Sequence, residues 1–179
     1  MKILLPPSET KREGGDGVPL DLDRLALPSL RPQRAAVLAA LSELAADEGA
    51  SRRVLKLSDR QLGDIAHNRT LLTAPTMPAV DRYTGVLFDA LDAGSLPAAS
   101  RRWLGAHVWI HSAPLGPIGA LDPIPPYRLA AGTSLPGVPA LRRLWAEATS
   151  AAIAAEAPPF ILALRSEAYV ALGPVPAPV

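Results

Sequence analysis

The sequence contains no cysteine, and this absence removes several classes of site at once. A disulfide framework, a thiol redox switch and a zinc–thiolate site all require cysteine sulfur. Any chemistry in this chain must therefore come from oxygen and nitrogen side chains.

The chain also lacks a strong net charge and a long apolar run. Its 18 basic and 17 acidic residues leave a net charge of +1, so binding to nucleic acid or to a membrane surface would need a local patch. No stretch approaches the roughly 18 uninterrupted apolar residues of a membrane-spanning helix. The opening "MKILLPPSET" has too short an apolar run for a signal peptide. These features predict a cytoplasmic protein with no membrane partner.

What the sequence does contain is enough apolar material for one folded unit. The 179 residues are 49% hydrophobic, with a mean hydropathy of +0.17. This length and composition predict a single domain over residues 1–179 with its own core. The twenty prolines fall between periodic segments, where they end elements and stiffen loops.

Hydrophobic periodicity predicts four helices and three strands. Residues 31–50 have the apolar spacing of an amphipathic helix, which Gly49 closes. Ser58 and Gln61 have the spacing of a capping box at the start of the second helix. The other expected elements are helices over 59–72, 77–91 and 138–157, strands over 3–5, 106–113 and 160–164, and a long loop over 114–137. The alternation predicts a mixed α/β fold, with a central sheet flanked by helices.

Polar residues follow the expected strands, and in an α/β fold such positions line one crevice. They are Ser8, Glu9 and Lys11 after the first strand, Ser112 after the second, and Arg165, Ser166 and Glu167 after the third. One interpretation is a shared binding pocket at the strand ends. The other is that the serine and glutamate residues cap the helices that follow.

Two of the three tyrosines stand beside an arginine. Tyr83 follows Arg82, and Tyr127 precedes Arg128 in a proline-rich stretch. Tyrosine stacks on planar groups and arginine pairs with a carboxylate or phosphate through two parallel donors. Alternatively, each pair is a solvated arginine beside a half-buried tyrosine. The candidate ligand-binding residues are therefore Ser8, Glu9, Lys11, Tyr83, Ser112, Tyr127, Arg128, Ser166 and Glu167.

A basic cluster lies in the second predicted helix region and just before it. Such a cluster is typical of proteins that bind DNA through its phosphates, although a solvated helix face has the same composition. The candidate DNA-binding residues are Arg52, Arg53, Lys56, Arg60 and Arg69. His107 and His111 would lie about 13 Å apart on a strand, too far to share one ion, so no metal site is predicted. No cofactor motif and no catalytic residue can be assigned.

Read in order, several motifs resemble the peroxide stress protein YaaA family, also called UPF0246 or DUF328, in its actinobacterial form. They are "ILLPPSETK", "DRYTGVLFDAL", "HSAPLGPIGALDPIPPYRLAAG", "LRRLW" and "LALRSEAYVAL". The resemblance implies a mixed α/β fold described as cantaloupe-like. It also implies a cytoplasmic role in the response to hydrogen peroxide that limits damage from intracellular iron, and DNA binding through a basic cleft with a helix-hairpin-helix-like element.

The positions that match the family motifs extend over most of the chain. They are Pro7, Ser8, Lys11, Tyr83, Gly85, Ser112, Gly116, Asp122, Tyr127, Arg128, Gly132, Trp145, Ser166 and Tyr169. Two features depart from the family. The Gly-hydrophobic-Gly turn of a helix-hairpin-helix is missing around Gly63. Family members also usually continue beyond "GPVPAPV" by about a third more length, which is still within the ordinary range for one domain. We therefore expect a chain that lacks the family's C-terminal segment.

Two functions remain open from the sequence. The first is a stress-response protein that associates with DNA, without sequence preference. The second is an enzyme that acts on a small planar metabolite, such as a nucleobase or nucleotide, in the strand-end pocket. A continuous basic groove would favour the first, and basic side chains that converge on a closed pocket would favour the second.

Overall fold

The three expected strands lie side by side in one sheet of the computed structural model, which describes residues 1–176. The sheet has the order β4-β3-β1-β6. Strands β1, β3 and β6 are parallel, and β4 is antiparallel to β3, so the sheet is mixed as predicted. The bounds are β1 Lys2–Leu5, β3 Val108–Ser112, β4 Gly116–Gly119 and β6 Ile161–Ala163, and β2 Met77–Pro78 pairs with β5 Pro123–Ile124 in a second, smaller sheet.

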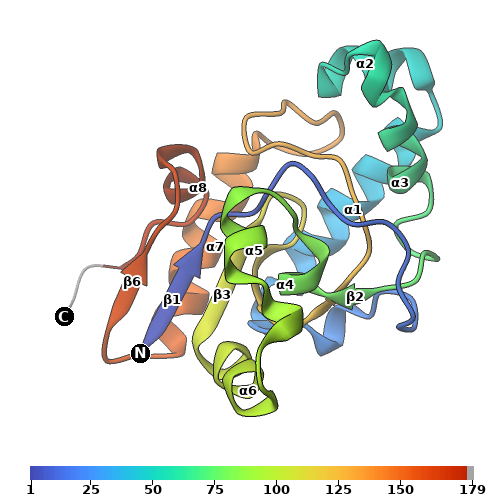
Figure 1. The fold of residues 1–179 in the computed structure, drawn as a ribbon. Coiled ribbons are helices and arrows are strands. Elements are labelled where there is room, and N and C mark those ends of the chain that lie inside the picture. The colour runs from blue at the N-terminus through green and yellow to red at the C-terminus, as the bar shows by residue number, and fades with distance from the viewer. Residues whose placement is uncertain (177–179) are drawn as a thin grey trace.

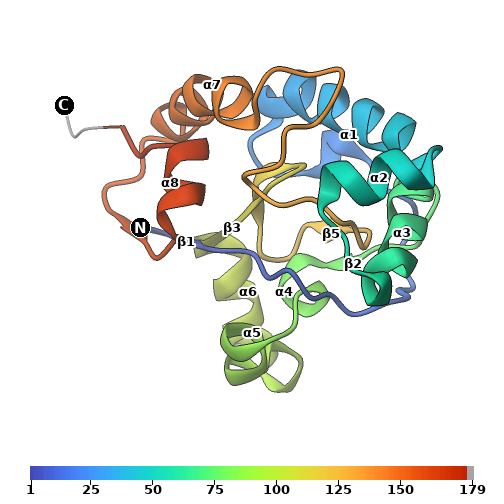
Figure 2. The same cartoon turned by 90° about the horizontal axis from the view of Figure 1, so that it is seen from above.

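Helices cover both faces of this sheet. The α-helices are α1 Arg31–Ala45, α2 Glu48–Leu55, α3 Ile65–Arg69, α4 Ala79–Arg82, α5 Val86–Leu91, α6 Ala98–His107, α7 Leu141–Ala155 and α8 Glu167–Leu172. Short 3₁₀ helices span Leu22–Arg24, Pro28–Leu30, Asp59–Asp64 and Ala93–Ser95. Figures 1 and 2 show α7 and α8 on one side of β1 and β3, with α5 and α6 on the other. The mixed α/β class is therefore confirmed.

Two predicted helices are divided where the sequence offers a second start. The helix expected over 31–50 ends at Ala45, and Asp47 begins α2 by accepting a hydrogen bond from the Ala50 N–H at 2.9 Å. Gly49 thus lies in the first turn of α2, and the prediction that it closes the helix was wrong. The first N–H groups of a new helix have no partner within it, and an aspartate in the N-cap position accepts a hydrogen bond from one of them.

The helix expected over 77–91 breaks at Gly85, which has a φ of +96°. A side chain is strained at that angle, so glycine is the residue that permits the break. The segment after Ser58 is mostly 3₁₀ rather than α-helical, although Gln61 does accept a hydrogen bond from the Ser58 N–H at 3.1 Å as the capping box predicts.

The expected long loop over 114–137 contains β4 and β5, so the loop prediction was wrong for those residues. Buried Arg34 of α1 explains how proline- and glycine-rich segments stay ordered there. Its guanidinium donates to the carbonyls of Leu115 at 2.8 Å, Pro117 at 2.9 Å and Ala26 at 2.7 Å. Carbonyl groups that would otherwise be buried without a donor are paired in this way.

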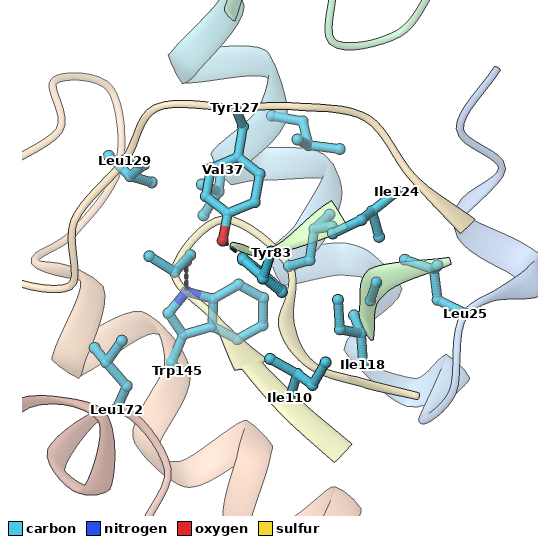
Figure 3. Packing of buried hydrophobic residues seen from close by; sticks show 14 of the residues in the cluster. Leu25, Val37, Tyr83, Ile110, Ile118, Ile124, Tyr127, Leu129, Trp145 and Leu172 are labelled. Carbon is cyan, nitrogen blue, oxygen red and sulfur yellow. Dashed lines mark hydrogen bonds between the residues drawn. The ribbon is translucent and has the colours of Figure 1, made fainter. Parts of the chain in front are cut away.

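Apolar side chains from both faces of the sheet form one connected cluster. Figure 3 shows part of it, including Trp145 of α7, Ile110 of β3, Ile118 of β4 and Tyr83. The indole N–H of Trp145 donates to the Ala113 carbonyl at 3.1 Å. In residues 1–176, no helix combines the length and the apolar character needed to cross a membrane.

Candidate functional site

The loop after β1 is held against the break between α4 and α5. Lys11 forms an isolated antiparallel bridge with Tyr83, and the Thr84 N–H donates to the Thr10 carbonyl at 3.2 Å. Pro6 and Pro7 end β1 because neither can donate to a strand ladder. The sequence thus directs this loop out of the sheet and back across the centre of the molecule.

Arg82 holds the same loop through a backbone carbonyl and lines none of the three hollows around Arg128. It is fully buried, and its guanidinium donates to the carbonyls of Arg12 at 2.5 Å, Pro75 at 3.2 Å and Ile124 at 3.1 Å. Arg82 and Tyr83, the first Tyr-Arg pair, therefore have different roles. Its arginine joins loops through their backbone, and only Tyr83 lies near the candidate site.

Three hydroxyl groups form a buried chain beneath the site. The hydroxyls of Tyr83 and Tyr127 lie 2.7 Å apart, and the Ser112 Oγ lies 3.1 Å from the Tyr127 hydroxyl (Figure 3 shows the two tyrosines). The two rings meet edge to face, with centroids 6.4 Å apart. Burial raises the pKa of both tyrosines, so both hydroxyls stay protonated near neutral pH.

Lys11 lies on the outer face of these two rings. Its Nζ is 4.1 Å from the centroid of the Tyr127 ring and 5.5 Å from that of Tyr83. The amine donates to the carbonyls of Ser8 and Glu9, each at 3.1 Å. Desolvation by burial, together with the nearby positive charge of Arg128, lowers the pKa of Lys11 to about 7.

Arg128 is held beside Lys11 by its backbone and by two carboxylates. Asn68 of α3 accepts from the Arg128 N–H at 2.8 Å and donates to its carbonyl at 2.9 Å. The guanidinium lies 3.4 Å from Glu9 and 3.9 Å from Asp64. Because the Glu9 side chain is 72% exposed, an anionic ligand can engage this guanidinium by displacing the Glu9 carboxylate.

A pocket of about 240 Å³ opens where these groups meet. Ser8, Lys11, Arg128 and Tyr169 contribute polar groups to its wall, and Leu129 and nearby alanines contribute apolar surface. Glu9 and Arg128 also line two neighbouring hollows, of about 290 Å³ and 600 Å³. The Glu9–Arg128 ion pair therefore stands at the junction of all three.

A second set of hydroxyls borders the pocket on the side of the first loop. The Thr10 Oγ1 lies 3.2 Å from the Ser8 Oγ and 2.9 Å from the Thr84 Oγ1. A Cβ at position 85 would lie 3.3 Å from the Ser8 Oγ. Gly85 thus allows the loop to approach closely as well as allowing the helix break.

Ser166 and Glu167 lie outside this pocket, contrary to the expected convergence at the strand ends. Both are exposed at the start of α8, with Ser166 in the N-cap position. The pocket wall instead receives Ala168 and Tyr169 from this helix. The alternative that these two residues begin the next helix describes their position better, although the Ser166 side chain makes no capping hydrogen bond.

Arg165 is also directed away from the pocket, into a buried contact with His111. Its Nη1 lies 2.7 Å from the His111 Nδ1 and 2.8 Å from the Gly173 carbonyl. Burial and the Arg165 charge lower the pKa of His111 to about 3, so the ring is neutral and accepts the hydrogen bond. His107 lies apart at the end of α6, where it stacks on Trp103. Among residues 1–176 no three potential metal ligands cluster.

The five candidate DNA-binding residues lie on α2, on α3, on the 3₁₀ helix between them and, for Lys56, directly after α2, at the end of the molecule opposite β6 (Figure 1). Arg52 is paired with Asp59, and Arg69 donates to the Ala45 carbonyl at 2.8 Å. Arg53 and Lys56 line the 600 Å³ hollow beside Arg128. Arg60 is exposed. The structure thus brings two of the five residues to the edge of the candidate site.

Four residues that contact the site residues were not predicted from the sequence. Asn68 and Asp64 come from the predicted basic helix region, and Thr10 and Thr84 come from within motifs whose neighbours were selected. Tyr169 also lines the pocket and was not selected as a candidate, although its match to a family motif could have identified it. A buried asparagine that clamps a distant backbone has no local pattern by which it can be recognised.

Comparison with known proteins agrees with this organisation of motifs. The family model described as "Peroxide stress protein YaaA" matches residues 1–176. A UPF0246 protein of Corynebacterium glutamicum is 44% identical over 98% of this chain and 70% of its own length. A UPF0246 protein of Streptomyces coelicolor is 45% identical over 96% of this chain and 66% of its own length. This chain is therefore a member of the peroxide stress protein YaaA (UPF0246) family.

Proposed function

We propose that this chain acts in the peroxide stress response by binding and transforming a small anionic molecule in the pocket between Lys11 and Arg128. Membership of the YaaA family supports the stress-response role. From the resemblance to this family we further propose that the protein is cytoplasmic and that it limits damage from intracellular iron. The small-molecule activity is the alternative that the geometry favours.

The observation that carries this proposal is the position of the Lys11 amine, which lies 4.1 Å from the centroid of the Tyr127 ring in a pocket that Arg128 also lines. A lysine on the protein surface is almost fully charged at neutral pH, whereas a pKa of about 7 leaves about half of the Lys11 amines neutral. A neutral amine is a general base or a nucleophile, and enzymes obtain one by desolvating a lysine or placing it beside a second cation. Lys11 is desolvated by burial and also lies beside a second cation, Arg128.

The pocket also limits the size and charge of the ligand. Its volume of about 240 Å³ lies below the roughly 300–1,000 Å³ typical of drug-sized ligands. Arg128 offers a planar, two-pronged donor, and Tyr169 offers an aromatic side chain in the wall. A small planar acid or a nucleobase therefore fits this pocket by itself, whereas a whole nucleotide would also have to occupy the neighbouring hollows.

The first prediction is that Arg128→Lys abolishes most anion binding while the fold is retained. Lysine keeps the charge but loses the planar donor pair, so we expect affinity for a small acid to fall at least about tenfold. The melting temperature should change little, because lysine keeps the charge that pairs with Glu9 and Asp64, whose side chains are 72% and 37% exposed. Isothermal titration with pyruvate, benzoate and inorganic phosphate measures the binding.

Arg102→Lys is the matched control, since Arg102 is exposed on α6 and lies outside the pocket. It should leave both binding and melting temperature unchanged. Failure of all three probes to bind the wild type, or equal binding by Arg128→Lys, would contradict the small-anion site. A lowered melting temperature with binding lost only in proportion to unfolding would make Arg128 a structural residue.

DNA binding is a second candidate, favoured by the position of Arg53 and Lys56 beside an open hollow that also reaches Arg128. Phosphate contacts from such residues give affinity without sequence preference. Because Arg52 and Arg69 are already paired within the chain, fewer cations are free than the sequence suggests. We therefore rank it below the small-molecule site.

The second prediction tests this surface with the triple variant Arg52→Glu, Arg53→Glu and Lys56→Glu. If the surface binds DNA, the wild type should bind duplexes of unrelated sequence at low salt and lose most affinity by 0.2 M salt, as phosphate contacts require. The triple variant should not bind. Fluorescence anisotropy measures both, and unchanged binding by the variant would locate any DNA surface elsewhere.

A further inference from the structure

The neutral form of the Lys11 amine can make the same two hydrogen bonds as its charged form, although the contact with the Tyr127 ring favours the charged one. An ammonium group has three N–H donors, whereas a neutral amine has two donors and one lone pair. The carbonyls of Ser8 and Glu9 accept two hydrogen bonds from Nζ. Within residues 1–176, Nζ makes no third hydrogen bond to an oxygen, and on one side the amine faces the Tyr127 ring. The neutral amine is therefore satisfied in place and keeps an unused lone pair.

The cation beside this amine is positioned to hold an acid at the same time. Both residues contact Glu9, Lys11 through the Glu9 carbonyl at 3.1 Å and Arg128 through the Glu9 carboxylate at 3.4 Å, and both line the 240 Å³ pocket. A ligand that engages both must carry its anionic group next to the atom that the amine attacks. Among small metabolites, 2-oxo acids have a carboxylate bonded directly to a carbonyl carbon.

We propose that Lys11 condenses reversibly with the carbonyl carbon of a small 2-oxo acid whose carboxylate is bound by Arg128. This inference rests on the small-anion site proposed above and names its substrate class and its nucleophile. Nothing in it requires an oxidant, a reductant or a metal.

The condensation balances within the pocket. The Nζ lone pair forms a bond to the carbonyl carbon, and one N–H proton passes from the nitrogen to the carbonyl oxygen, which gives a neutral carbinolamine. The carbinolamine then loses its hydroxyl group as water, with one N–H proton lost, and the C=N bond of an imine forms. Addition of water reverses the sequence and returns the free amine and the 2-oxo acid.

Groups already in the pocket wall suit these proton transfers. Ser8 and Tyr169 line the pocket, and burial raises the pKa of Tyr169, so its hydroxyl remains protonated near neutral pH. The protonated imine keeps one N–H, for which the Ser8 and Glu9 carbonyls remain acceptors. The site thus accommodates both the free amine and the adduct.

The test is reductive trapping, and the composition of the chain makes it unambiguous. The sequence has only three lysines, Lys2, Lys11 and Lys56. The protein is incubated with pyruvate, reduced with sodium borohydride, and analysed by intact mass and peptide mapping. We expect one reduced pyruvate adduct per chain, on Lys11, and none with lactate, which has the same carboxylate but no carbonyl group.

Variants separate a specific imine from general amine labelling. Lys2→Arg and Lys56→Arg should trap pyruvate as the wild type does, and Lys11→Arg should lose at least about 90% of the adduct while keeping a folded circular dichroism spectrum. Adduct spread evenly over the lysines and the N-terminus would overturn the proposal, and so would no adduct at all. Calorimetry distinguishes the two proposals. Pyruvate binding that depends on Arg128 without trapping overturns only the imine, whereas neither binding nor trapping overturns both.

Discussion

Acidification from pH 6.5 towards pH 3 should destabilise this protein through a single histidine, by roughly 4 kcal/mol in the free energy of unfolding at the lower limit. His111 is fully buried in β3, and its pKa falls from 6.5 to about 3 in the folded state. The unfolded chain binds a proton at higher pH than the folded chain, so the histidine favours the folded state fully above pH 6.5. That contribution is lost progressively as the pH falls through the interval.

The groups around His111 make protonation costly. Arg165 faces it with a positive charge, Tyr169 packs 5.7 Å away between ring centroids, and the nearby Thr149 carries no charge. Urea unfolding at pH 7, 5.5 and 4 measures the effect. The difference between wild type and His111→Gln isolates this residue, because all carboxylates titrate alike in both.

The matched control is His107→Gln, on a histidine that is only partly buried. It should leave the pH dependence of the wild type intact. If His111→Gln loses stability between pH 7 and pH 4 as steeply as the wild type does, the buried histidine is not the acid-sensitive group.

The main elements of the fold were predictable because they depend on local patterns. The apolar run at Ile3 and the β-branched and aromatic content around Trp109 identify central strands, and periodic apolar positions identify α1 and α7. Boundaries were less predictable where a capping residue competed with continuation, as at Asp47. Strand β4 was missed because its glycine and proline content is typical of a turn, whereas buried Arg34 supplies the hydrogen bonds that keep this backbone ordered.

The candidate site was predictable only in part. Residues next to strand ends or in Tyr-Arg pairs, such as Lys11 and Arg128, could be selected from sequence, and the structure places both at one pocket. The sequence could not show that Arg82 faces the interior while Arg128 faces the pocket, because the two pairs look alike locally. The low pKa of Lys11 could not be inferred either, since it arises from rings and charges far apart in the chain.

The remaining prediction is that Lys11→Met stabilises the protein below pH 7 while it abolishes imine trapping. Lys11 has a pKa of about 7 when folded and 10.5 as the ordinary value, so the unfolded chain binds the proton more tightly. The folded state therefore bears the full cost of this residue below pH 7, and the cost disappears as the pH rises to 10.5. After allowance for partial exposure and for the two lost hydrogen bonds, we expect a gain of about 1–2 kcal/mol at pH 6.

The pH dependence of the gain distinguishes it from better apolar packing. Greater apolar burial would stabilise equally at pH 6 and pH 10, whereas relief of a buried charge fades between pH 7 and pH 10.5. Lys56→Met is the matched control, because Lys56 is exposed and should change stability by less than about 0.5 kcal/mol at either pH. Loss of stability in Lys11→Met at pH 6 would show that the lysine supports the fold. A gain in stability with loss of trapping would show instead that the chain keeps a destabilising amine at this position for its chemistry, as is typical of residues in active sites.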